Sequence, residues 1–258
     1  MNRYFRLVLC VVVPLVAFGL FFVAHVADAG PLDLNVVQVQ TDENGAQTYS
    51  LSLQVLLIMA GLTLLPAALL SCTAFTRIIV VLSLLRQALG TAQTPPNQVL
   101  VGLALFITFV IMQPVLTAIN QDAIAPYIAE TITGNEAVEK GKSILKKFMV
   151  ANTREKDITV MSSLQNIGDF ETIDSVPISV VIPAFVTSEL RTAFEIGFLL
   201  FIPFLVIDLV VSSVLMSLGM MMLSPMLVSL PFKLLLFVAV DGWVMTVGSL
   251  VSSYNAGT

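Results

Sequence analysis

The sequence of 258 residues has little charge: Asp, Glu, Lys and Arg make up 11% of it, and hydrophobic residues make up 57%. Soluble globular domains contain about 25% charged residues. The mean hydropathy of +0.95 agrees with this depletion. The composition therefore excludes an ordinary soluble domain. It indicates an integral membrane protein, or a chain assembled with others into a hydrophobic particle.

Metal-binding and redox side chains are also scarce, with one His and two Cys in the whole chain. A zinc or redox cluster needs several such residues, so we predict no metal and no cofactor. The net charge of −5 comes without a basic patch, so nucleic-acid binding is not expected. Because a Gly-rich phosphate loop and a Ser/His pair are also missing from the sequence, an enzyme is not expected either.

The N-terminus has the pattern of an export signal. Arg3 and Arg6 precede an apolar run that extends to Ala24, and a small-x-small site ends at Ala29. This pattern predicts a secretory signal peptide over residues 1–29, cleaved after Ala29. Because the apolar run is long for a signal peptide, an uncleaved membrane anchor is the alternative.

The rest of the chain alternates between apolar and polar stretches. Gly and Pro residues, which end and restart helices, divide it into two helical hairpins and a polar segment. The polar segment holds nine of the 17 acidic and six of the 12 basic residues, so water exposure is expected there. We predict an all-α fold with four hydrophobic helices. Its parts are a flexible arm over 30–50 with a turn at 42–45, a first hairpin over 51–119, a helical extracytoplasmic segment over 120–177 and a second hairpin over 178–258.

The first hairpin begins with a helix that is expected to run from Leu51 to Leu89, interrupted at Pro66. Its later part carries Arg77 and Arg86 and no acidic residue. By the positive-inside rule, this part faces the cytoplasm. The polar segment then lies on the extracytoplasmic side, which agrees with an exported N-terminus.

The second hairpin contains two isolated charges, because Asp208 and Lys233 are the only ionisable side chains between Glu195 and Asp241. Burial of such charges is costly unless they are paired. Counted from a tip near Leu223, Asp208 lies about fifteen residues before it and Lys233 about ten after it, an offset of about 7 Å along the hairpin. A stagger between neighbouring copies would remove this offset. We therefore expect Asp208 of one copy to pair with Lys233 of the next for assembly, with a pair inside one chain as the alternative.

Two other interpretations of these charges remain open at this point. Asp208 and Lys233 could form the coupling site of a transporter or channel, although no internal repeat supports it. Asp208 and Asp241 could form an intramembrane aspartyl protease dyad, although neither has the Gly-x-Gly-Asp context. Five further charges are expected to be buried by protein, because helices broken by prolines are poor lipid-facing spans: Arg77, Arg86, Glu189, Arg191 and Asp241.

A methionine triplet, Met220, Met221 and Met222, follows Gly219 and precedes Pro225. Since Gly ends helices and Pro restarts them, the triplet is expected at or beside the hairpin turn. Taken alone, the pattern favours methionines that pack the turn or meet lipid.

Several long, ordered motifs occur along the chain: Pro183–Phe198, Pro231–Phe237 with Asp241-Gly242-Trp243, Phe75–Ile79, Pro95–Leu100 and Gly102–Phe106. Together they closely resemble the motifs of the FliP family of the bacterial flagellar type III export apparatus. The resemblance covers roughly residues 51–254, and injectisome homologues share the motifs.

The resemblance implies a non-enzymatic subunit of the export gate through which unfolded flagellar proteins cross the inner membrane. Family members form a pentamer. With FliQ and FliR they build a closed, helically staggered assembly inside the MS ring of the basal body, above FlhA and FlhB. Their apparently transmembrane hairpins lie largely on the periplasmic side of the bilayer. The resemblance also implies that Met220, Met221 and Met222 form a gasket at the channel constriction.

Overall fold

The computed structural model describes residues 37–41, 47–51, 53–91, 93–165, 175–220 and 223–254, and describes side chains from Ile58 onward apart from Leu65. The predicted signal peptide and the predicted turn at 42–45 lie outside the described residues and stay predictions. The chain divides into two compact units, one that ends at Leu69 and one that begins at Leu70.

The first unit contains a two-stranded β-hairpin followed by most of a helix. β1 (Val37–Thr41) pairs antiparallel with β2 (Gln47–Leu51), and α2 extends over Leu53–Ser71. The alternation of Val and Gln in β1 is typical of a strand. The helical prediction holds from Leu53 onward, and the hairpin adds strands to residues that we expected to form a flexible arm.

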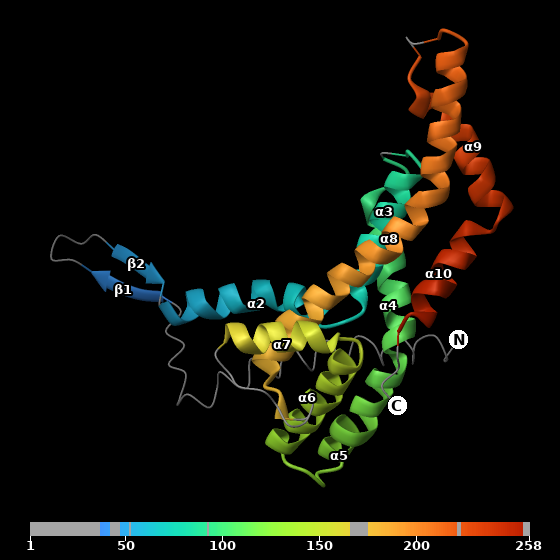
Figure 1. Ribbon diagram of the computed structural model, residues 1–258. Helices are drawn as coiled ribbons and strands as arrows, with labels where there is room; N and C mark the ends of the chain where they lie inside the picture. The colour runs from blue at the N-terminus through green and yellow to red at the C-terminus, as the bar shows by residue number, and fades with distance from the viewer. Residues whose placement is uncertain are drawn as a thin grey trace, which may run out of the picture. The chain divides into compact units, whose positions relative to one another are not determined.

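The described residues of the second unit form helices joined by turns and short connections (Figure 1). A π-helical turn, η1, continues α4 directly into α5. The long helix α8 then runs to the tip of the second hairpin, with a length of about 60 Å. The bounds are α3 (Phe75–Ala88), α4 (Asn97–Ile119), η1 (Asn120–Ile124), α5 (Ala125–Ile128), α6 (Gly134–Ala151), α7 (Glu155–Leu164), α8 (Ile178–Ser217), α9 (Pro225–Ala239) and α10 (Gly242–Ser252).

By length and composition, two segments of the described residues could cross a membrane: Asn97–Ile128 and Ile178–Ser217. The number rises to as many as four if each of two broken helix pairs forms one span. The predicted count of four hydrophobic helices is therefore an upper value.

The first long helix breaks later than predicted. Pro66 lies inside α2, and the break comes between Ser71 and Phe75. The Thr73 hydroxyl donates to the Leu70 carbonyl (2.8 Å) and accepts from the Phe75 N–H (3.3 Å). This side chain satisfies backbone groups at one helix end and at the next helix start, where they lack helical partners.

The last hydrophobic stretch is also broken, into α9 and α10, whose axes differ by 63°. Asp241 lies at the break with a φ of 50°. A Cβ at Gly242 would lie 2.2 Å from the Phe237 ring. Since that distance is far below van der Waals contact, the corner requires glycine at this position.

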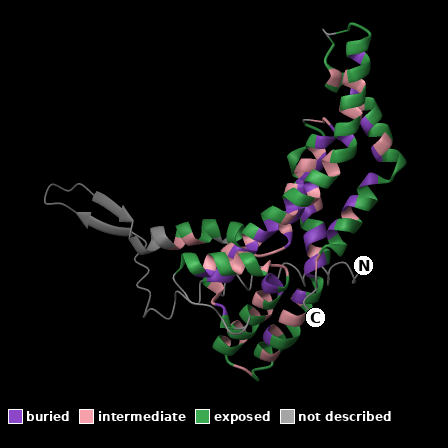
Figure 2. Cartoon of the chain, viewed as in Figure 1, coloured by how far each residue is buried: buried purple, intermediate pink, exposed green. Residues whose placement is uncertain are grey.

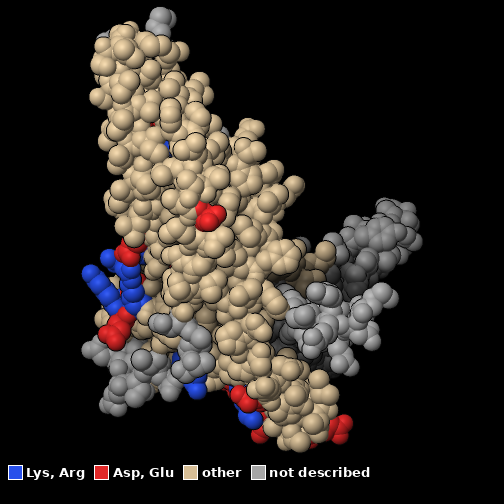
Figure 3. Space-filling view, turned by 90° about the vertical axis from the view of Figure 1, so that its right-hand side faces the viewer, with Lys and Arg blue, Asp and Glu red and all other residues tan. Residues whose placement is uncertain are grey.

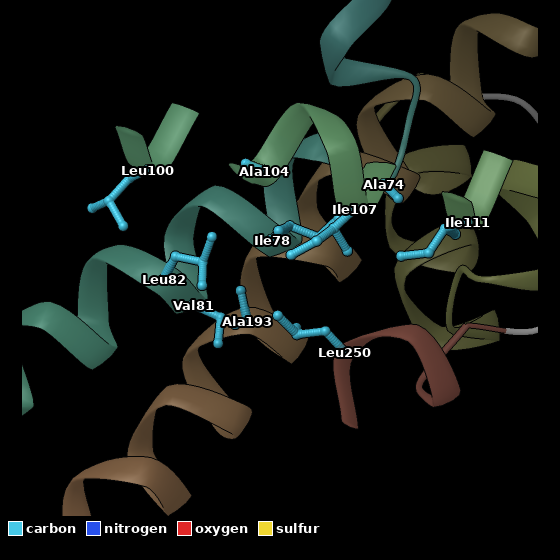
Figure 4. Close-up of a cluster of buried hydrophobic side chains, with 10 residues drawn as sticks. All are labelled: Ala74, Ile78, Val81, Leu82, Leu100, Ala104, Ile107, Ile111, Ala193 and Leu250. Carbon is cyan, nitrogen blue, oxygen red and sulfur yellow. The ribbon is translucent and has the colours of Figure 1, made fainter. Parts of the chain in front are cut away.

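The core of the second unit lies where α3, α4, α8 and α10 meet (Figure 4). Its buried residues are Ala74, Ile78, Val81, Leu82, Leu100, Ala104, Ile107, Ile111, Ala193 and Leu250. A second cluster joins α4, α6 and the start of α8, and includes Phe148 and Phe185. A third joins the end of α3 to α8 and α9 through Leu85, Phe204 and Phe237. These clusters fix the base of the α8–α9 hairpin.

Much of the apolar surface of α8 and α9 has no cover within the chain. Only 11% of the most apolar stretch of α8 is buried, and Figure 2 shows exposed residues along most of the hairpin. Figure 3 shows most of the Lys, Arg, Asp and Glu atoms toward the opposite end of this unit from the hairpin tip, with one isolated acidic group part-way up the apolar face. Large exposed apolar faces mark contacts with protein or lipid.

Candidate functional site

The tip of the α8–α9 hairpin is built by a glycine cap. Gly219 has a φ of +74°. The N–H groups of Gly219 and Met220 donate to the carbonyls of Met216 and Leu215, each at 3.0 Å. Glycine adopts this left-handed conformation without Cβ strain, and the two hydrogen bonds close the helix end. α8 therefore ends directly before the methionine triplet, as predicted.

Apart from Ser217 and Ser224, most described side chains around the tip are apolar and exposed. Met220 is 43% exposed, and Met216 and Met226 are also exposed. Met221 and Met222 lie outside the described residues, so the gasket stays a prediction. Met216 and Met226 were not predicted from the sequence, although Met216 lies four residues before Met220 and Met226 directly follows Pro225.

Asp208 and Lys233 form an ion pair inside one chain, with 2.7 Å between Lys233 Nζ and Asp208 Oδ2. Lys233 Nζ also donates to the Ala88 carbonyl at 3.2 Å. The Ser229 hydroxyl donates to Asp208 Oδ1 at 2.5 Å. Ser229 and Lys233 are four residues apart on α9, so they share a helix face. This site joins the end of α3 to both arms of the hairpin.

The predicted pairing of Asp208 with Lys233 of a neighbouring copy is corrected by this geometry. Our count placed the tip near Leu223, whereas α8 ends at Ser217 and α9 begins at Pro225. Measured from these helix ends, Asp208 lies nine residues before the tip segment and Lys233 eight residues after it. The expected offset therefore disappears within one chain. Ser229 and the Ala88 carbonyl are partners that our sequence analysis missed.

Arg77 and Glu189 form a second ion pair, which lies fully inside the helical core. Arg77 Nε donates to Glu189 Oε2 at 3.0 Å, and Arg77 Nη2 donates to Glu189 Oε1. The two side chains are 4% and 0% exposed. The two parallel hydrogen bonds fix the carboxylate geometry and link α3 to α8. The predicted burial of Arg77 and Glu189 is confirmed.

The C-terminal end of the described chain completes this second site. Arg77 Nη1 donates to the carbonyl (3.1 Å) and the hydroxyl (3.0 Å) of Ser253, and its guanidinium lies 3.8 Å from the Tyr254 ring centroid. The Tyr254 hydroxyl donates to Glu189 Oε2, and the Ala74 carbonyl lies 3.2 Å from the same hydroxyl oxygen. Burial, together with the Glu189 carboxylate, raises the pKa of Tyr254 well above its ordinary value, so the phenol stays a donor.

The other three charges that we expected to be buried differ from that expectation. Arg86 is half-buried and donates to the Pro95 carbonyl (3.2 Å) and to Asn97 Oδ1 (2.6 Å). Arg191 is exposed, because it lies about 200° around α8 from the buried Glu189. Asp241 is exposed at the α9–α10 corner. The prediction that Arg191 and Asp241 are buried is therefore wrong within a single chain.

Metal chemistry gains no support from this geometry. Among the residues described here, the structure contains no group of three or more His, Cys, Asp or Glu side chains arranged to hold a metal ion. The buried polar side chains instead connect helices: one site holds the base of the bundle and the other holds the hairpin below its tip. The arrangement suits a rigid scaffold that presents an apolar tip.

Long apolar helices, buried ion pairs and uncovered apolar faces together define a helical membrane protein. The chain belongs to the FliP family: the model of the FliP family matches residues 58–250. The chain is 59% identical over 214 residues to a flagellar biosynthetic protein FliP of Cereibacter sphaeroides, which covers 83% of the chain and 71% of the relative. The predicted family is confirmed.

Relatives from other bacteria match over a similar range. A flagellar biosynthetic protein FliP of Pectobacterium carotovorum subsp. carotovorum is 52% identical over 238 residues, with 92% of this chain and 91% of the relative covered. One from Bacillus subtilis (strain 168) is 46% identical over 221 residues, with 86% and 98% covered. The match therefore includes both hairpins and the polar segment between them.

Proposed function

We propose that this chain is a core subunit of the flagellar type III export gate, the channel through which unfolded flagellar proteins cross the inner membrane. The observation that carries the proposal is the FliP family match over residues 58–250, supported by relatives that are named flagellar biosynthetic proteins. The subunit has a structural role and is not an enzyme.

The proposed assembly contains five copies of the chain together with FliQ and FliR, inside the MS ring and above FlhA and FlhB. The uncovered apolar faces of α8 and α9 support this arrangement, because in a chain that worked alone only lipid could cover them. The buried ion pairs fit the same picture, since charged side chains at membrane depth are tolerated where protein surrounds them. Much of the chain then lies on the periplasmic side of the inner membrane.

The methionine gasket, Met220, Met221 and Met222, is the proposed seal of the channel. A secretion channel must exclude water and ions when idle, yet admit chains of any sequence. Methionine suits both tasks, because its unbranched thioether adapts to irregular surfaces. The exposed Met220 and the exposed Met216 and Met226 beside it support the proposal. Several copies around one axis would supply many interchangeable side chains.

A deletion strain tests the proposed function. Cells that lack the chain are expected to export no hook or filament protein, and a plasmid copy of the chain is expected to restore export. The transporter alternative, with Asp208 and Lys233 as the coupling site, predicts instead a defect in the uptake of one small solute while flagellar export continues. Export that is unchanged in the deletion strain would contradict the proposal.

A further inference from the structure

The charges in the apolar part of the chain pair off almost completely. Helices α3, α4, α8, α9 and α10, together with the α9–α10 corner, carry four basic and four acidic side chains. Three ion pairs form within the chain: Arg77–Glu189, Arg191–Glu195 and Lys233–Asp208. Over the described residues, one cation and one anion of this set lack an oppositely charged neighbour. These are Arg86 and Asp241.

Arg86 has more hydrogen-bond donors than its contacts within the described residues use. Its Nη1 atom makes both of its contacts, with the Pro95 carbonyl and Asn97 Oδ1, and both acceptors are neutral. A guanidinium has five N–H donors, so the Nε and Nη2 edge can bind a carboxylate. This edge lies at the α3–α4 connection and is held by the contacts of Nη1.

Asp241 is an acid in an apolar surround. It is exposed, and so are Val240, directly before it, and Trp243, two residues after it. Its backbone lies in the left-handed region at the α9–α10 corner, which determines where the side chain leaves the main chain. Any contact that covers these apolar neighbours also removes water from the carboxylate, and an ion without water needs a partner.

The two charges lie at a similar level on different sides of the bundle. Leu85, beside Arg86, and Phe237, one turn before Asp241, belong to the same buried cluster. In Figure 1 the α3–α4 connection and the α9–α10 corner lie on opposite sides of α8. A cyclic assembly places one side of each copy against the opposite side of the next. We infer that Asp241 of one copy forms an ion pair with Arg86 of the next copy, an inference that rests on the proposed assembly of several copies.

Disulfide trapping in the complete complex tests the contact directly. The background is the full chain with Cys10→Ala and Cys72→Ala. Mild oxidation of cells that express Arg86→Cys with Asp241→Cys is expected to give disulfide-linked dimers and higher multiples of the chain. Each single cysteine variant should stay monomeric on a denaturing gel, and so should a control with Lys147→Cys, an exposed cation on α6, in place of Arg86→Cys.

Charge reversal provides the second readout. Arg86→Glu and Asp241→Arg are each expected to lower the amount of complex at least about tenfold, and the double variant should restore most of it. Lys147→Glu with Asp241→Arg should restore nothing. The inference is overturned if the cysteine pair forms no dimer, or if the double reversal assembles no better than the single variants. The proposed function stands in that case if the wild-type complex still contains several copies and supports export, and it fails independently if that complex holds one copy.

Discussion

The carboxylate of Glu189 accepts hydrogen bonds from two nitrogens of Arg77, a residue 112 positions earlier in the chain, and both side chains are buried. Tyr254 donates a third hydrogen bond to the same carboxylate. A single carboxylate therefore joins α3, α8 and the residues after α10. The base of the bundle depends on this site more than on any surface charge.

Glu189→Ala tests the contribution of this site to stability. The variant leaves a buried guanidinium without its anion, so we expect a loss of about 3–5 kcal/mol in the free energy of unfolding. Tyr254→Phe, which keeps the ring on Arg77, should lose about 1–3 kcal/mol. Thermal unfolding in detergent measures both. Glu195→Ala on the same helix removes an exposed carboxylate and should have a much smaller effect, and an equal effect of Glu195→Ala and Glu189→Ala would contradict the account.

The Asp208–Lys233 pair predicts unequal effects of removing its two charges. Lys233 is 4% exposed and Asp208 is 40% exposed. Asp208→Asn leaves the buried ammonium without an anion, whereas Lys233→Met leaves a carboxylate that is half-exposed and bonded to Ser229. We therefore expect Asp208→Asn to lower the free energy of unfolding by about 3–5 kcal/mol. It should reduce the yield of folded protein more than Lys233→Met does. Fluorescence-detected size exclusion of detergent extracts gives the comparison. The reverse order would contradict the within-chain geometry.

Gly197 sets the close approach of α3 and α8. A Cβ at this position would lie 2.2 Å from Leu84 Cδ1 and 3.2 Å from Leu84 Cβ, so rotation of Leu84 alone does not relieve the clash. Gly197→Ala is expected to cost about 1–3 kcal/mol, and Leu84→Ala in the same chain should relieve part of it. Gly102→Ala on α4, where a Cβ meets nothing within 4 Å, should instead be neutral or stabilising. Thermal unfolding of Gly197→Ala, of Gly197→Ala with Leu84→Ala and of Gly102→Ala measures these differences in stability.

The methionine gasket predicts a leak without a loss of export. Met220→Ala, Met221→Ala and Met222→Ala together shorten the side chains at the tip but leave the Arg77–Glu189 and Lys233–Asp208 ion pairs intact. The complex should assemble and secrete, while the membrane admits small ions and solutes. Small-solute uptake measures this, with Met245→Ala, an exposed methionine on α10, as the control. A triple variant as tight as the wild type would place the seal elsewhere.

Local sequence patterns predicted much of this fold. Gly219 and Pro225 located the hairpin turn, and the segment over 120–177, which was expected to be helical, contains α6 with a capping box of Thr133 and Glu136 at its start. The proline-broken helices indicated that Arg77 and Glu189 would be buried, although the same argument was wrong for Arg191 and Asp241 within a single chain. Such signals are readable because they depend on residues within one or two helical turns.

The choice of partners could not be predicted in the same way. Whether Lys233 meets Asp208 of its own chain depends on where α8 ends to within a few residues, since each residue shifts a helix by about 1.5 Å. The contact of Ser253 and Tyr254 with Arg77 spans 176 residues or more, and no local pattern encodes it. The exposure of Asp241 follows from the α9–α10 break, which depends on the packing of Phe237 against Gly242.

The mass of the native complex, solubilised in mild detergent and purified through this chain, tests the central claim most directly. The account predicts a particle that contains several copies of the chain, five in the proposed assembly, in a fixed ratio with FliQ-like and FliR-like subunits. Native mass spectrometry resolves the copy number and the partners in one measurement. A particle that contains one copy of the chain and no such partners would contradict the account.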